Sequence, residues 1–199
     1  MRESTAGYAA EADRLAVSYE SITFEDVHRD ILHLIPEPPG RALDIGAGTG
    51  RDAAALVRRG FQVTAAEPTA ELRRHGQSLH ADLPIRWLAD GLPDLPLLTA
   101  AGERFGLVLL TAVWMHLDAA ERERAMQGVT PLVARGGRLA ITLRHGPVPD
   151  GRRMFDVAAD EVTEQAAIHG LRLLHHARRS DMFGRGDVTW DVLMLERPA

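Results

Sequence analysis

The sequence predicts a three-layer α/β fold, in which helices cover both faces of a seven-stranded, mostly parallel sheet. Short apolar runs alternate with helical segments along the chain, as in strands joined by helical crossovers. The run from Phe105 to Ala112 is almost entirely apolar, which indicates a central strand buried on both faces. The last two strand-like runs, 171–177 and 189–195, leave no room for a helical crossover, so we expect the last strand to be antiparallel.

The other elements follow from periodicity and turn residues. Residues 8–35 have apolar positions at near-helical spacing, and a Pro-rich stretch then ends this helical region. Thr49 with Asp52, and Asp118 with Glu121, have the spacing of helix-capping boxes, so we expect helices to begin there. We also expect strands at 41–46, 62–66, 85–89 and 138–143. Two helices should end near residues 60 and 80, and a further helix should cover 155–169.

Composition restricts both organisation and chemistry. The 199 residues suit one domain, which we divide into a helical amino-terminal cover at 1–36 and the sheet at 37–199. The amino terminus is polar and no apolar run is long enough to span a membrane, so we expect a cytoplasmic location without membrane association. The absence of Cys excludes disulfides, a zinc-thiolate site and a thiol nucleophile, and we expect no metal site. All 23 basic residues are Arg, which excludes lysine chemistry.

The main candidate for ligand binding is the glycine-rich turn Asp44-Ile45-Gly46-Ala47-Gly48-Thr49-Gly50. Glycines let a ligand approach the backbone closely, and the N-terminus of the following helix supplies unpaired N–H groups. A dinucleotide fingerprint would have a third Gly or Ala at the position of Arg51. The Asp44 carboxylate would also repel a pyrophosphate, whereas it suits a ligand that carries an ammonium and a sulfonium.

With these features the sequence resembles the class I methyltransferases, which bind S-adenosylmethionine on a Rossmann-like fold, and the resemblance covers nearly the whole chain. The glycine-rich turn resembles the family's first motif, which holds the methionyl part of the cofactor. Glu67 and Pro68 end the second strand, where the family places an acid that binds the ribose hydroxyls. Asp90 and Gly91 resemble the third motif, whose acid approaches the adenine amine.

The resemblance also implies contacts from later and earlier segments. Thr111 and Ala112 lie in a segment that resembles the fourth motif, near the reacting methyl group. The amino-terminal cover resembles the segment that closes over the cofactor in small-molecule members. The candidate cofactor-binding residues, for S-adenosylmethionine and its product S-adenosylhomocysteine, are Tyr19, Asp44, Gly46, Ala47, Gly48, Arg51, Glu67, Pro68, Asp90, Gly91, Thr111 and Ala112.

Histidine and aromatic residues supply the candidates for the acceptor side. His116 follows the fourth strand and is the candidate general base, because an ordinary histidine pKa near 6.5 suits proton transfer. Its alternative role is helix capping or packing against the cofactor. Tyr8, Trp114, His145 and Arg152 are candidates for substrate contacts. Their alternatives are core packing for Tyr8 and Trp114, a solvated loop for His145, and an ordinary surface position for Arg152.

The sequence therefore predicts an enzyme that transfers a methyl group to a small molecule by in-line displacement. A net charge of -5 disfavours nucleic acid as a partner, and the Asn/Asp-Pro-Pro-Tyr/Phe signature of base-methylating members is absent. Arginines 144, 152, 153 and 185 lie in loops near the expected acceptor side, which raises the hypothesis of an acidic acceptor. Two alternatives stay open: a cofactor-binding but non-catalytic partner subunit, and an NAD-dependent oxidoreductase.

Overall fold

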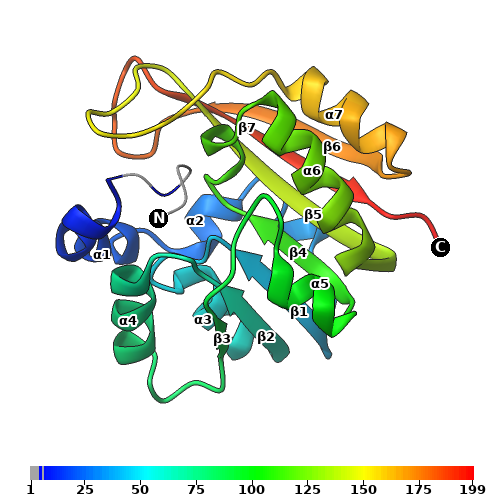
Figure 1. Ribbon diagram of the computed structural model, residues 1–199, viewed down its shortest axis with the longest axis horizontal. Helices are drawn as coiled ribbons and strands as arrows, with labels where there is room; N and C mark the ends of the chain where they lie inside the picture. Colours follow the sequence, from blue (N-terminus) through cyan, green and yellow to red (C-terminus); the bar gives the residue numbers. More distant parts are fainter. Residues whose placement is uncertain (1–4, 6) are drawn as a thin grey trace.

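The computed structural model describes residue 5 and residues 7–199 and contains a seven-stranded sheet in the order β3-β2-β1-β4-β5-β7-β6 (Figure 1). The strands are β1 (Gly40–Ile45), β2 (Phe61–Ala66), β3 (Arg86–Leu88), β4 (Phe105–Leu110), β5 (Val133–His145), β6 (Arg172–Ser180) and β7 (Thr189–Glu196). The first five pair in parallel, and β7 lies antiparallel between β5 and β6. The predicted fold class and its antiparallel last strand are confirmed.

Helices cover both faces of the sheet (Figure 1). The helices and 3-10 helices (η) are η2 (Ala9–Glu11), α1 (Ala12–Glu20), α2 (Phe24–His28), η3 (Leu32–Leu34), α3 (Arg51–Arg58), α4 (Ala70–Leu79), α5 (Pro96–Ala101), η4 (Trp114–His116), α6 (Ala119–Val129), η5 (Thr130–Leu132) and α7 (Ala159–Ile168). The core on one face includes Phe24 of α2 and Leu56 of α3. The core on the other face includes Leu98, Met126 and Val162 from α5, α6 and α7.

The helical region predicted at 8–35 consists of the short helices η2, α1, α2 and η3 with turns between them. Leu15 of α1 packs against Leu72 of α4, away from the two main cores. The side chain of Thr23 accepts a hydrogen bond from the Asp26 N–H, and the Asp26 carboxylate accepts one from the Thr23 N–H. This capping box starts α2 in a new direction. The short pieces can thereby pack on different partners, which one straight helix would not allow.

The two predicted capping boxes have different outcomes. Asp118 and Glu121 form the one at the start of α6. The one predicted for Thr49 and Asp52 is wrong, because α3 begins after Gly50 in the left-handed region at φ 83°. The Thr49 hydroxyl donates instead to the Glu20 carboxylate at 2.7 Å.

Two further differences from the sequence prediction concern the helices α5 and α7. Helix α5 is absent from the sequence prediction, and the Asp90 carboxylate accepts hydrogen bonds from the N–H groups of Leu97 and Leu98 in its first turn. The helix predicted at 155–169 begins only at Ala159. The Phe155 N–H donates to the Met115 carbonyl at 2.8 Å, which holds the preceding loop against η4.

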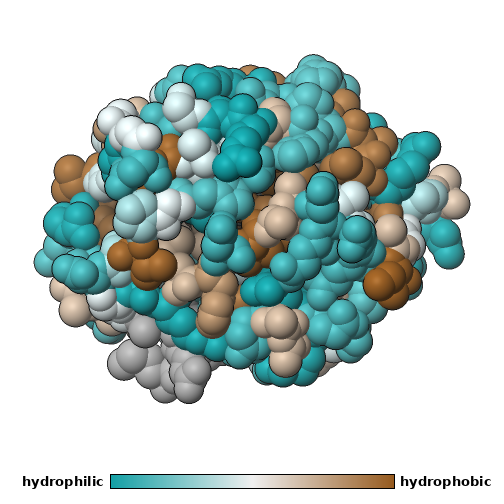
Figure 2. Space-filling view, turned by 90° about the horizontal axis from the view of Figure 1, so that it is seen from above, coloured by the Kyte–Doolittle hydropathy of each residue, from teal (hydrophilic) through white to brown (hydrophobic). Residues whose placement is uncertain are grey.

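The surface shows no sign of a membrane-crossing element in the part of the chain that is described. There, none of the helices combines the length and the apolarity needed to cross a bilayer. On the face in Figure 2, apolar side chains form separate small patches among hydrophilic ones. Isolated apolar patches of this kind are ordinary on folded domains.

Candidate functional site

A cavity of about 540 Å³ lies where the parallel strands end. Its walls include the glycine-rich turn after β1, Glu67 after β2, the segment 111–113 after β4 and Arg144 in β5. Residues of η2 and α1 close it from the amino-terminal side. Ligands of open α/β sheets bind at this edge, because the loops that follow parallel strands converge there.

The glycine-rich turn is held in a shape that only small residues allow. The N–H groups of Gly46 and Ala47 both donate to the Ala66 carbonyl, which ties the turn to β2. Gly46 has a φ of +72°, and a Cβ atom there would lie 2.5 Å from Cγ2 of Val113. Gly48 has a φ of +57° and its open side faces the ring of Tyr19. The backbone of the turn therefore forms a close wall of the cavity.

Replacing Gly46 with Ala is expected to lower the free energy of unfolding by about 1–3 kcal/mol. The cause is a left-handed φ combined with contact to Val113. Adding Val113→Ala should restore only the part of the stability that is lost through the contact with Val113. Gly128→Ala is the matched control, because a Cβ atom there would meet its nearest neighbour at an ordinary 3.7 Å. Denaturant unfolding of the variants measures the difference. Equal stability of the Gly46 and Gly128 variants would contradict this account of the turn.

Two buried acids stand beside the turn. Glu67 accepts hydrogen bonds from the Gly48 N–H at 2.8 Å and from the Thr69 N–H at 2.7 Å, and burial raises its pKa. Each of its carboxylate oxygens keeps acceptor capacity for a further donor. Asp44 is 2% exposed, and its Oδ2 has no hydrogen-bond partner among the described residues. Burial and the neighbouring Asp52 carboxylate raise the pKa of Asp44 well above its ordinary value.

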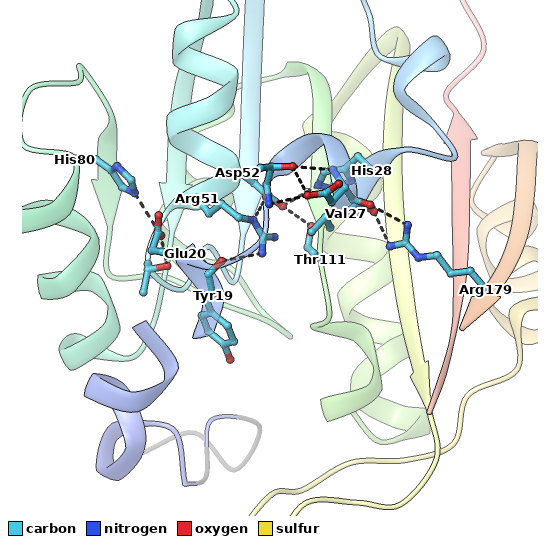
Figure 3. A network of polar contacts seen from close by, with 12 residues as sticks. Tyr19, Glu20, Val27, His28, Arg51, Asp52, His80, Thr111 and Arg179 are labelled. Carbon is cyan, nitrogen blue, oxygen red and sulfur yellow. Dashed lines mark hydrogen bonds and ion pairs between the residues drawn. The ribbon is translucent and has the colours of Figure 1, made fainter. Parts of the chain in front are cut away.

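Asp52 is the centre of a buried polar network (Figure 3). Its carboxylate accepts hydrogen bonds from Arg51 Nε at 2.7 Å, His28 Nε2 at 2.8 Å and the Thr111 hydroxyl at 2.9 Å. Burial alone would raise the pKa of Asp52, but the charges of Arg51 and His28 lower it below the ordinary value. Asp52 thus remains ionised and joins the amino-terminal cover, α3 and β4.

The same network fastens the described part of the amino-terminal cover over the cavity (Figure 3). Arg51 Nη1 donates to the Tyr19 carbonyl, and Glu20 accepts from Thr49 and lies 3.5 Å from His80. On the far side, Arg179 donates to the Val27 carbonyl at 2.6 Å. These contacts hold α1 and α2 in place independently of any ligand.

The cavity wall also contains a histidine–tyrosine pair. His116 Nδ1 lies 2.7 Å from the Arg153 carbonyl, and His116 Nε2 lies 2.8 Å from the Tyr8 hydroxyl. Because a carbonyl only accepts, Nδ1 carries the proton, and in the neutral ring Nε2 accepts from Tyr8. Burial lowers the pKa of His116 and raises that of Tyr8, so both groups are neutral near pH 7.

The remaining candidates divide between the cavity and the core. Pro68, Gly91 and Ala112 line the cavity together with the other predicted cofactor residues except Asp90. Asp90 is fully buried beneath α5. Arg152 lines the cavity, where it pairs with Glu11 and stacks 3.8 Å above the ring of Tyr8.

Two acceptor-side candidates do not line the cavity. Trp114 is fully buried in the core beneath the helices α5 to α7, which agrees with its core-packing alternative. His145 pairs with Asp156 at 2.7 Å and with Asp191 at 2.8 Å. Neighbouring residues of a strand point to opposite faces, so placing Arg144 in the cavity turns His145 away from it.

Comparison with known proteins identifies the domain. Residues 42–137 match a family model described as a methyltransferase domain. An uncharacterized methyltransferase of Mycobacterium tuberculosis is 33% identical over 118 residues, which are 58% of this chain and 57% of the relative. The matched region is a methyltransferase domain. The chain spans little more than half the length of that relative.

Solved structures share the fold of this methyltransferase. A TehB-like SAM-dependent methyltransferase from Corynebacterium glutamicum has a TM-score of 0.70 at 22% identity, over 94% of this chain and 98% of that one. The 1,6-didemethyltoxoflavin-N1-methyltransferase of Burkholderia thailandensis has a TM-score of 0.63 at 20% identity, over 94% of this chain and 79% of that one. The latter structure contains 1,6-didemethyltoxoflavin and S-adenosylhomocysteine.

S-adenosylmethionine is the cofactor of this methyltransferase family, and the acidic end of the cavity fits it. The unpartnered Oδ2 of Asp44 is suited to an ammonium donor, and Glu67 has acceptor capacity for ribose hydroxyls. Asp44, Asp52 and Glu67 together place three buried carboxylates around the turn. Such a charge distribution attracts a cationic ligand and repels a pyrophosphate, so it favours this cofactor over a dinucleotide.

Several residues of this methyltransferase site had no signal in the sequence. His28, Glu20 and Arg179 reach the network from distant segments, and Asp52 was interpreted only as a helix cap. In the sequence, Arg144 is one of several arginines in predicted loops, and its neighbouring residues do not distinguish it from the others. A weak signal existed for Asp52, because an acid in the first turn of a helix beside a ligand-binding turn is well placed to order it.

Proposed function

We propose that this chain transfers the methyl group of S-adenosylmethionine to a small-molecule acceptor. One observation carries the proposal: a single cavity is lined both by the acids Asp44 and Glu67 and by the pair Tyr8 and His116. Its volume of about 540 Å³ lies within the roughly 300–1,000 Å³ of small-molecule sites. The Burkholderia structure supports a small acceptor, because a protein of the same fold there has both 1,6-didemethyltoxoflavin and S-adenosylhomocysteine bound.

The protein's own groups hold the cofactor, exclude water and move a proton. The bound cofactor supplies an electrophilic methyl group, which leaves the sulfonium by in-line displacement. Asp44 and Glu67 hold its polar ends, and α1 shields the site from water. An acceptor O–H or N–H gives its proton to the Tyr8 oxygen while the Tyr8 proton passes to Nε2 of His116. The Arg153 carbonyl stabilises the resulting imidazolium through Nδ1–H.

The pH dependence of kcat should reflect the lowered pKa of His116. Protonation of His116 removes the only free lone pair of the ring, so activity is lost as pH falls through this pKa. Because burial lowers the pKa from 6.5, we expect the midpoint of the acid limb of kcat to lie below pH 6.5. Cofactor-product release measured across pH tests this. An acid limb centred above pH 6.5 would contradict it.

Binding and turnover measurements test the proposed function and its alternatives. Calorimetry should show binding of S-adenosylmethionine and S-adenosylhomocysteine, and no comparable binding of NADH. Tight binding of NADH alone would overturn the proposal in favour of an oxidoreductase. Release of S-adenosylhomocysteine is then measured with a panel of small metabolites. Cofactor binding without release for any acceptor would favour the non-catalytic partner subunit.

A further inference from the structure

Arg144 differs from the other arginines of the cavity in its lack of an ionic partner. Five of the six lining arginines lie within ion-pair distance of a carboxylate: Arg14 and Arg152 with Glu11, Arg51 with Asp52, Arg179 with Asp30, and Arg185 with Asp181. Arg144 has no such partner among residue 5 and residues 7–199. Arg153, another loop arginine, pairs with Asp118 and Glu121 and does not line the cavity.

The guanidinium of Arg144 is also poorly hydrogen-bonded. The residue is only 8% exposed, and its Nη1 donates to the Pro147 carbonyl at 2.8 Å. Its Nε is buried without a hydrogen-bond partner in the described structure. Burial and the nearby Arg185 guanidinium lower the pKa of Arg144, and the more distant carboxylates of Asp181 and Asp187 offset this only in part. A buried cation without full compensation is costly, so its position in a ligand cavity calls for an anion.

The position of Arg144 separates it from the cofactor acids. Asp44 lies in β1 and Glu67 follows β2, whereas Arg144 lies in β5, beyond β4. Adjacent strands are about 4.8 Å apart, so two strand spacings place Arg144 roughly 10 Å from Asp44 across the sheet. Trp190 of β7 stands directly opposite Arg144 and also lines the cavity. Arg144 thus belongs to the end of the cavity that the cofactor acids do not occupy.

The neighbours of Arg144 suit the rest of an organic anion. Asp181 is engaged by Arg185 and by the Trp190 Nε1–H at 2.9 Å, so it offsets the charge of Arg144 only in part. Met182 and Phe183, in the turn after β6, add apolar surface to the cavity. One uncompensated cation beside apolar and aromatic side chains matches a monoanion with a carbon skeleton better than a dianionic phosphate.

We propose that Arg144 binds the carboxylate of the methyl acceptor, so that the acceptor is an organic acid. This inference rests on the proposed methyl transfer and names the substrate class for the same cavity. Binding neutralises the buried guanidinium and directs the remainder of the acceptor along the cavity wall. The acceptor's nucleophilic group is thereby placed on the side of Tyr8 and His116, between the carboxylate and the cofactor.

Matched acid and amide probes test this proposal. Benzoate with benzamide, 4-hydroxybenzoate with 4-hydroxybenzamide, and phenylacetate with phenylacetamide are titrated into protein saturated with S-adenosylhomocysteine. We expect at least one acid to bind about tenfold or more tightly than its amide, because a charge-assisted bond is about twice as strong as a neutral one. Arg144→Gln should abolish the preference, and Arg144→Lys should retain part of it. Phenyl phosphate should bind more weakly than the preferred acid.

The control and the contrary outcomes separate this proposal from the proposed function. Arg178→Gln is the matched control, because Arg178 is exposed on β6, contacts Thr189 and does not line the cavity. It should retain the acid preference. Equal binding of acids and amides, no binding of any acid, or a preference that survives in Arg144→Gln would each overturn the role of Arg144.

The affinity for the cofactor distinguishes a failure of the Arg144 proposal from a failure of the proposed function. Arg144→Gln should bind S-adenosylhomocysteine as tightly as the wild type, which also shows that the variant folds. If its affinity for S-adenosylhomocysteine falls as far as its affinity for acids, Arg144 serves the cofactor's carboxylate and the inference fails. If Arg144→Gln does not fold, the same probes are titrated into Arg144→Lys, and its preference for acids decides. If the wild type binds neither form of the cofactor, it is the proposed function that fails.

Discussion

Replacing His116 with Ala is expected to lower kcat by about 10²–10⁴-fold for an acceptor that must lose a proton. The variant lacks the ring nitrogen that receives the Tyr8 hydroxyl proton at 2.8 Å. Affinity for S-adenosylhomocysteine should be unchanged, because the variant leaves Asp44 and Glu67, the candidate cofactor acids of the cavity, unaltered. Single-turnover methyl transfer measures the chemical step, and calorimetry measures cofactor affinity.

Two variants make the His116 result specific. Tyr8→Phe removes the relay hydroxyl and leaves His116 in place, so it should also lower kcat, by less than His116→Ala if the acceptor can reach Nε2 directly. His33→Ala is the control, because His33 is exposed and outside the cavity lining, where it contacts the ring of His175. Full activity of His116→Ala toward a hydroxyl acceptor would show that the acceptor needs no base from this pair.

Replacing Asp44 with Asn should weaken S-adenosylmethionine binding by about 10–100-fold, because a hydrogen bond between charged groups contributes about 1.5–3 kcal/mol. The same change should increase the stability of the free protein near pH 7. Burial raises the pKa of Asp44, so the folded state binds its proton more tightly than the unfolded state. The ionised side chain therefore destabilises the fold as pH rises above the unfolded pKa of about 3.9.

Calorimetry and thermal unfolding at several pH values test both parts of the Asp44 prediction. The stability gain of Asp44→Asn should be largest at neutral pH and disappear in acid. Asp94→Asn is the matched control, because that carboxylate is exposed at 63% and pairs with Arg124 on the surface. A variant that binds the cofactor normally would remove Asp44 from the site. A loss of stability at neutral pH would mean that the carboxylate is compensated in the free protein.

Patterns in neighbouring residues were sufficient to predict the sheet and the turn that lines the cavity. A glycine-rich turn after a buried strand is encoded in consecutive positions such as Gly46 and Gly48, and both have positive φ in the structure. The start of α6 was equally predictable, because Asp118 and Glu121 are three residues apart and bond to each other. Local sequence is informative where the interacting groups are local.

Predictions failed where distant groups compete for a residue. Thr49 has the spacing of a helix cap, yet its hydroxyl binds Glu20 and Gly50 begins the helix. The division of the amino-terminal region into short helices was not predicted, and it arises because Leu15 and Phe24 pack on different partners. Trp114 lies in the core because η4 turns its ring away from the cavity wall. Each outcome depends on packing between segments, which periodicity does not describe.

The sequence by itself determined the succession of the strands and the acidic glycine-rich turn, because both follow from short-range periodicity and spacing. Only the tertiary structure decided which charges in the cavity are compensated. Arg152 is matched by Glu11, which lies 141 positions earlier in the chain, whereas Arg144 has no carboxylate within ion-pair distance in the described structure. Coulomb interactions depend on distance and burial, and neither quantity exists before the chain has folded.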